Sequence, residues 1–139
     1  MLKLVIPGEP CAQGRPRFTM SNGQAKAYDP EKSRNYKAFV KLITQQEIKK
    51  QGWRYTELPL QVIVNAYMSI PTSKPKKFKT AALEGFERPT KKPDVDNIFK
   101  AVTDALSGIA YKDDKQIVSA TINKWYAEEP RTEISIEIL

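Results

Sequence analysis

Residues 58–70, LPLQVIVNAYMSI, decide the fold class of this chain. Every second side chain from Leu60 to Met68 is apolar, which is the spacing of a strand with one buried face. Ile63 and Tyr67 make the opposite face largely apolar as well. Because a strand with two apolar faces is typical of the centre of a sheet, we predict a central strand that is covered on both sides.

Helices are predicted before and after this strand. Residues 30–51 have helical spacing, with Asp29 as the N-cap and Gly52 as the stop signal. Residues 94–107 carry an apolar stripe along one side of a helix, and Gly108 follows at the position where a helix commonly ends. The two segments predict the main helices of the fold.

Strand patterns recur near both ends of the chain. Residues 1–6 and 117–126 have strand spacing, and residues 132–139 alternate isoleucine with polar residues, which suits an antiparallel strand with one wet face. We therefore predict an α+β fold in a single domain of residues 1–139. Its mixed sheet has about four strands and two main helices, in the order β-α-β-α-β-β.

Two segments, at about residues 9–29 and 71–92, combine turn-forming residues with cations, and we predict that both are exposed basic loops. The net charge is +7, and the excess of cations lies before residue 93. A basic surface binds polyanions because neutralised phosphates release counterions, whereas the alternative is that these cations only keep the protein soluble. The candidate phosphate-binding residues of the two loops are Arg15, Arg17, Lys74, Lys76, Lys77 and Lys79.

The composition excludes several chemistries. The 139 residues contain no histidine and one cysteine, Cys11, which rules out histidine catalysis, an intrachain disulfide, a cysteine-rich zinc site and an iron-sulfur cluster. Any metal ion must therefore be bound by oxygen. Because no stretch has the pattern of a signal peptide or a spanning helix, we expect a soluble, cytoplasmic protein without membrane partners.

Acidic residues gather at two places in the last third of the chain. Asp94 and Asp96 stand at the start of the second predicted helix, and Asp113 and Asp114 stand in the turn after it. Close carboxylates repel each other unless a cation lies between them, and Mg²⁺ prefers oxygen ligands from a few carboxylates and a substrate phosphate. We therefore interpret the four aspartates as candidate ligands of Mg²⁺, with Mn²⁺ as an alternative. Either residue of the second pair could be the principal ligand.

Structural roles are the alternative for each pair. Aspartate is a favoured N-cap, and it is also common in turns. A helix of about 14 residues is roughly 21 Å long, so its two ends are not adjacent. We expect the chain to come back along this helix, so that Asp114 can reach Asp94.

Lys100 lies one turn beyond Asp96 on the same side of the predicted helix. Its ammonium group can reach back toward the carboxylates or toward a bound phosphate, and the alternative is a simple ion pair with Asp96. Asp104 stands toward the negative end of the helix dipole, which indicates either a partner elsewhere or a solvated surface carboxylate.

Three motifs together resemble the RusA family of Holliday junction resolvases, which are usually carried by phages and prophages. They are KPDVDNIFKA at residues 92–101, DAL at 104–106 and YKDDKQI at 111–117. The looser start of the family is matched by Gly8, Pro10 and residues 15–17. The resemblance implies a RusA-like fold and a homodimeric, Mg²⁺-dependent endonuclease that nicks four-way DNA junctions symmetrically during DNA recombination and repair.

The resemblance also assigns roles to individual residues. It implies that Asp94, Asp96 and Asp114 are catalytic metal ligands, with Asp113 beside them. Lys100 matches the catalytic lysine, and the basic residues that often precede the first aspartate are Lys91 and Lys92 here. On these assignments one or two Mg²⁺ ions lie beside the scissile phosphate, and Lys100 stabilises the charge that grows on it.

Two other functions fit part of the pattern. A non-catalytic module could bind junctions or other nucleic acids with the same basic surface, and its affinity would not depend on Mg²⁺. A metal-dependent phosphohydrolase could share the carboxylates, but it would turn over free nucleotides and would gain little from cations spread over residues 1–92. A nuclease accounts for both the basic and the acidic part of the chain.

Overall fold

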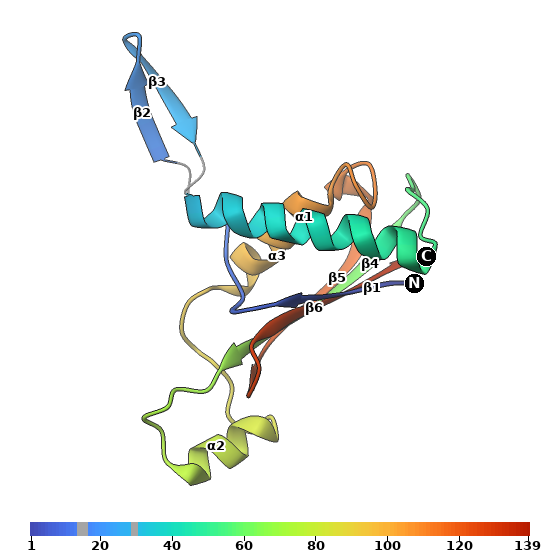
Figure 1. Cartoon of the computed structure of the whole chain (residues 1–139). Helices are drawn as coiled ribbons and strands as arrows, with labels where there is room; N and C mark the ends of the chain where they lie inside the picture. The colour runs from blue at the N-terminus through green and yellow to red at the C-terminus, as the bar shows by residue number, and fades with distance from the viewer. Residues whose placement is uncertain (14–16, 29–30) are drawn as a thin grey trace.

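A four-stranded mixed sheet with the order β1-β6-β4-β5 forms the centre of the fold (Figure 1). The computed structural model describes residues 1–13, 17–28 and 31–139. β6 lies antiparallel between β1 and β4, and β5 pairs with β4 in parallel. The strands are β1 (Leu2–Pro7), β4 (Leu60–Ser69), β5 (Ile117–Ala127) and β6 (Arg131–Ile138).

Two helices, α1 (Glu31–Gln51) and α3 (Val95–Leu106), pack on one face of this sheet (Figure 1). The core lies between the two layers, where alternate strand residues meet the apolar stripes of the helices. Its largest fully buried members include Leu2, Leu4, Ile6, Val40, Val62, Val64, Ile98, Leu106, Ile134 and Ile136. The predicted α+β class, both main helices and the four strands are confirmed.

The central strand is covered less evenly than predicted. β4 does lie between β5 and β6, and its alternate residues starting at Leu60 are buried. Ile63 and Tyr67 on the opposite face are only half-buried. The guanidinium of Arg131 lies 4.0 Å from the centre of the Tyr67 ring, so a side chain of the neighbouring strand shields this residue.

A hairpin stands where an exposed loop was predicted for residues 9–29. β2 (Arg17–Ser21) pairs with β3 (Gln24–Tyr28) around Asn22 and Gly23. Both turn residues have positive φ, at 53° and 76°, which is the geometry that a two-residue hairpin turn needs. The hairpin projects away from the sheet (Figure 1). The predicted N-cap of α1, Asp29, lies outside the described residues.

A short helix, α2 (Lys76–Leu83), occupies part of the other predicted basic loop. Pro75 takes its N-cap position, and Gly85 follows it with φ of 85°. α2 and α3 together form the crossover between the parallel strands β4 and β5. In the part of the chain that the structure describes, none of the helices is long and apolar enough to span a membrane.

The end of α1 is fastened to the edge of the sheet. The Gln51 side chain accepts a hydrogen bond from the Lys3 backbone N–H at 3.0 Å and donates one to the Lys3 carbonyl at 2.7 Å. This pair of bonds ties the last residue of α1 to β1, at the side of the strand that faces away from β6.

Candidate active site

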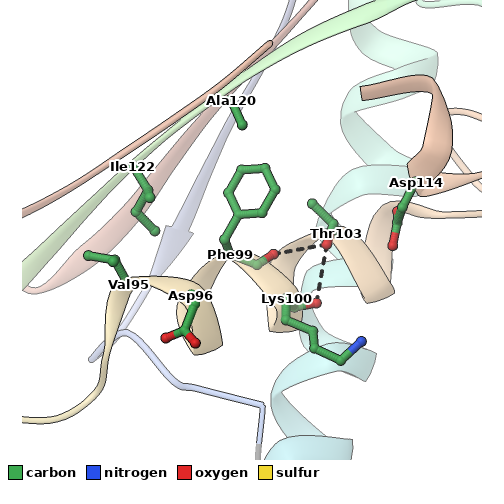
Figure 2. Close-up of a pocket in the computed structure, with 8 residues that line it drawn as sticks. All are labelled: Val95, Asp96, Phe99, Lys100, Thr103, Asp114, Ala120 and Ile122. Atoms are coloured by element: carbon green, nitrogen blue, oxygen red, sulfur yellow. Dashed lines mark hydrogen bonds between the residues drawn. The ribbon is translucent and has the colours of Figure 1, made fainter. Parts of the chain in front are cut away.

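A pocket of about 390 Å³ lies between α3 and β5 (Figure 2). One side is apolar, and Figure 2 shows the Phe99 ring reaching from α3 toward Ala120 of β5. The polar residues of the lining contribute two carboxylates, one ammonium group and one hydroxyl. The lining consists of Val95, Asp96, Phe99, Lys100, Thr103, Asp114, Ala120 and Ile122.

The amphipathic pattern of α3 determines which side chains reach the pocket. Ile98 and Val102 are fully buried in the core, while Asp96 and Lys100 are exposed, four residues apart on another side of the helix. Asp94 takes the N-cap position, with extended φ and ψ, but within the described residues its carboxylate makes no capping hydrogen bond. The capping alternative is therefore not supported for the Asp94 side chain, which is exposed to solvent.

Lys100 points toward Asp104 in this structure. Its Nζ lies 3.5 Å from a carboxylate oxygen of Asp104, one turn further along α3. The Lys100 side chain is 63% exposed, so the pair contributes little to stability and the ammonium group is free to move toward a bound phosphate. Asp104 thus has an ion-pair partner on its own helix. The sequence predicted that Lys100 reaches back toward Asp96, whereas in the structure it reaches forward to Asp104.

Asp113 and Asp114 have different surroundings. Asp113 caps the short 3₁₀ helix η1 (Asp114–Gln116) by accepting a hydrogen bond from the Lys115 N–H at 2.9 Å, and its own N–H donates to the Gln116 side chain at 2.8 Å. Asp114 instead lines the pocket. Its carboxylate accepts a hydrogen bond from the Tyr111 hydroxyl at 3.0 Å. The structure therefore favours Asp114 over Asp113 as the carboxylate that acts in the pocket.

Burial raises the pKa of Asp114 above the ordinary value of an aspartate. The negative charges of Asp104 and Asp113 raise it further, while the Tyr111 hydrogen bond and the Lys100 charge lower it. A carboxylate that is partly desolvated and near other carboxylates is stabilised when a cation binds beside it. This environment fits a metal ligand better than a surface turn.

Asp114→Asn is expected to raise the melting temperature in Mg²⁺-free buffer near neutral pH. The pKa of Asp114 is higher in the folded state than in the unfolded chain. The free energy of unfolding of the wild type therefore falls as the pH rises from the unfolded-state pKa through the folded-state pKa. Asparagine has no charge to desolvate and keeps an oxygen that can accept from Tyr111. Calorimetry from about pH 3 to 8 should show the advantage of the variant growing with pH. A variant that melts below the wild type at neutral pH would contradict this.

The four predicted aspartates do not converge into one cluster. Among the residues that the structure describes, no three acidic, histidine or cysteine side chains lie close enough to hold a metal ion. Asp96 and Asp114 line the same pocket, whereas Asp94 is not part of its lining. The expected return of the chain along α3 occurs only in β5, after Asp114. The backbone bonds of Ala110 N–H to Leu106 O at 2.9 Å and of Gly108 N–H to Tyr111 O at 2.7 Å close a tight turn, so Asp114 stays near the end of α3.

Comparison with known proteins identifies the family. The profile of the family described as Endodeoxyribonuclease RusA matches residues 7–137, which is nearly the whole chain. The chain belongs to the RusA family. It is also similar to the Uncharacterized protein YqaN of Bacillus subtilis (strain 168), with 42% identity over 137 residues that cover 97% of this chain and 94% of that protein. The resemblance stated from the three motifs is confirmed.

RusA-family membership gives the chain the general activity of an endodeoxyribonuclease that resolves Holliday junctions, and branched DNA is the substrate that it implies. RusA-family nucleases generally depend on a divalent metal ion. The donor chemistry of the pocket suits such an ion, because Asp96 and Asp114 offer carboxylate oxygens and the chain has no histidine, and the two carboxylates reach the pocket from opposite ends of α3. With two carboxylates in the lining, water and substrate phosphate would supply the other ligands of a hard cation.

The residues predicted to bind DNA lie in several places on this RusA-family chain. Arg15 lies outside the described residues, and Arg17 begins β2. The other candidates belong to the crossover that leads from β4 to α3, either before or in α2 or directly ahead of Asp94. Among these candidates, the exposed ones are Lys74, Lys76, Lys77, Lys91 and Lys92, and Lys79 is half-buried.

Sequence reasoning missed two groups around the RusA-family site. Tyr111 was not assigned a role, although its spacing of three residues from Asp114 allows a contact across a tight turn. Arg88 was also missed. Its guanidinium lies 3.5 Å from the centre of the Trp125 ring, and its Nε donates to the Lys124 carbonyl at 2.6 Å, which fastens the basic segment before α3 to β5.

Proposed function

We propose that this protein is a Mg²⁺-dependent, structure-selective endodeoxyribonuclease that resolves four-way DNA junctions by paired, symmetric nicks. The observation that supports it best is the presence of Asp96, Lys100 and Asp114 in the lining of a single pocket. Such a set provides anionic ligands for a cation and one positive charge for the phosphate, which is what phosphodiester hydrolysis needs in a chain without histidine.

Asp96 and Asp114 are the proposed ligands inside the pocket, and Asp94 would join them from the N-cap of α3 when substrate is bound. Mn²⁺ could replace Mg²⁺ because it accepts the same oxygen donors. When bound, the ion would neutralise charge on the scissile phosphate and favour loss of a proton from the attacking water. Asp113, which caps η1, is proposed to act only by fixing the backbone at Asp114.

Lys100 is proposed to stabilise the charge that grows on the phosphoryl oxygens. Its ammonium group is mobile enough to leave Asp104 because that ion pair is exposed. Phe99 and Ile122 form part of the apolar side of the pocket. A cation acts more strongly beside such apolar side chains than in bulk water.

The cations of the crossover and of β2 are proposed to bind phosphates that flank the cut. Neutralising phosphates supplies affinity that does not depend on sequence, while the shape of the junction provides the selectivity. We also propose a homodimer, because two active sites related by a two-fold axis match the symmetry of paired nicks. DNA recombination and repair are the proposed cellular roles.

The test is a nicking assay with an end-labelled four-way junction and a linear duplex of matched sequence, each with and without Mg²⁺. We expect paired, junction-selective nicks only with the metal. Free nucleotides in place of DNA test the phosphohydrolase alternative. Junction binding that is tight but never followed by nicking, with either Mg²⁺ or Mn²⁺, would leave the binding-module alternative as the better explanation.

Asp94→Asn tests the proposed ligand role of this residue. The Asp94 side chain is exposed and makes no capping hydrogen bond among the described residues, so the melting temperature should stay the same. Nicking of the junction should nevertheless fall by about 10-fold or more, because a carboxylate ligand is lost. Equal nicking rates for the variant and the wild type, at saturating and at limiting Mg²⁺, would remove Asp94 from the ligand set.

A further inference from the structure

Tyr111 connects the pocket to the core. Its side chain is fully buried, and its hydroxyl oxygen lies 3.0 Å from a carboxylate oxygen of Asp114 and 3.3 Å from the carbonyl of Thr103. Thr103 is a pocket residue of α3. The hydroxyl therefore lies between the helix that carries Asp96 and the short η1 segment that carries Asp114.

The backbone of Tyr111 is held from two other sides. Its carbonyl accepts from the Gly108 N–H at 2.7 Å, and the residue forms an isolated bridge with Thr56. The next residue, Lys112, donates its N–H to the Thr56 carbonyl at 3.2 Å. Because the ring is buried and its main chain is bonded on both sides, the position of the hydroxyl is fixed before any ligand arrives.

The chemistry of the hydroxyl suits a permanent donor. A tyrosine hydroxyl ordinarily loses its proton only at about pH 10, so the buried O–H can donate to Asp114 at neutral pH. An O–H donor beside an ionised carboxylate makes a charge-assisted hydrogen bond. One carboxylate oxygen is then held, and the other is left for another partner.

We propose that Tyr111 is a positioning residue that orients the Asp114 carboxylate for cation binding. The inference rests on the proposed function, because it gives Asp114 the role of a ligand. A hydrogen bond from a second residue commonly orients a metal-binding carboxylate and raises metal affinity, and loss of such a partner typically weakens binding by about 10- to 100-fold. In this chain the tyrosine would provide that support from inside the core.

The experiment compares Tyr111→Phe with Tyr36→Phe in the full-length protein. The Tyr36 hydroxyl is also sheltered, and it lies 3.1 Å from the Thr132 hydroxyl rather than from a carboxylate. Both variants remove one hydroxyl and keep the ring. Melting temperature and Mg²⁺ affinity, measured by calorimetric titration without DNA, are the two readouts. We expect Tyr111→Phe to weaken Mg²⁺ binding by about 10-fold while Tyr36→Phe leaves it unchanged.

The outcomes separate this inference from the proposed function. If the wild type binds Mg²⁺ and Tyr111→Phe binds it with the same affinity, the positioning role is overturned and the nuclease proposal stays intact. Equal weakening in both variants would show a general loss of packing, and it would also overturn the role. If the wild type neither binds Mg²⁺ nor nicks junctions, the proposed function fails, and the inference fails with it.

Discussion

Asp96→Asn and Asp114→Asn are each expected to lower the rate of junction nicking by about 10²- to 10³-fold, with junction affinity nearly unchanged. Both carboxylates line the pocket between α3 and β5, from opposite ends of the helix. Asparagine keeps the shape and one oxygen of the side chain but removes the charge that attracts a divalent cation. Single-turnover nicking with excess enzyme gives the rate, and gel-shift titration in Ca²⁺ or without metal gives the affinity.

Asp113→Asn is the matched control for these two variants. It removes a neighbouring carboxylate, but asparagine can still cap η1 by accepting from the Lys115 N–H. Its nicking rate should stay within a few-fold of the wild type. If Asp113→Asn is as inactive as Asp114→Asn, the assignment of Asp113 to a capping role is wrong and the pair acts together on the metal.

Replacement of Lys74, Lys76 and Lys77 by glutamine is expected to weaken junction binding on the order of 10- to 100-fold at low salt. All three side chains are exposed, at or just before the start of α2. Each lost phosphate contact should also reduce the slope of log affinity against log salt by about 0.9, so the triple variant should lose up to about 2.7. Fluorescence anisotropy at several NaCl concentrations measures both effects.

The control for this variant removes the same charge from another surface. Lys41, Lys49 and Lys50 are exposed on α1, and two of them lie in its last turn, at the opposite end of the helix from the hairpin (Figure 1). Their replacement by glutamine should change the slope much less. Equal slopes for the two triple variants would mean that the net charge of the protein, rather than the crossover, determines DNA affinity.

Periodicity predicted most of the fold because the buried and exposed faces of its elements are well separated. α3 shows this best. Ile98 and Val102 are buried in the core, whereas Asp96 and Lys100 line the pocket and are exposed to solvent. The β2–β3 hairpin was missed because its segment was judged by its content of turn formers and cations. The Asn22-Gly23 pair, which favours a two-residue hairpin turn, was the local feature that could have revealed it.

The site was predictable in its residue types but less so in its geometry. Sequence spacing placed Asp94 and Asp96 at the start of α3, which is where they are. The distance of Asp114 from them depends on a turn that Gly108 and Ala110 close by backbone hydrogen bonds, and such bonds leave little trace in the pattern of apolar residues. The contact between Tyr111 and Asp114 depends on the same turn, so only the folded chain shows it.

The two hydrogen bonds between the Gln51 side-chain amide and the Lys3 backbone have a consequence for self-association. Strands at the margin of a sheet invite foreign strands to join them, and proteins often block this growth. Here a glutamine occupies the N–H and the carbonyl that an incoming chain would have to use at Lys3. A strand that added to β1 at this point would first have to displace the Gln51 amide, which therefore hinders edge-to-edge pairing at Lys3.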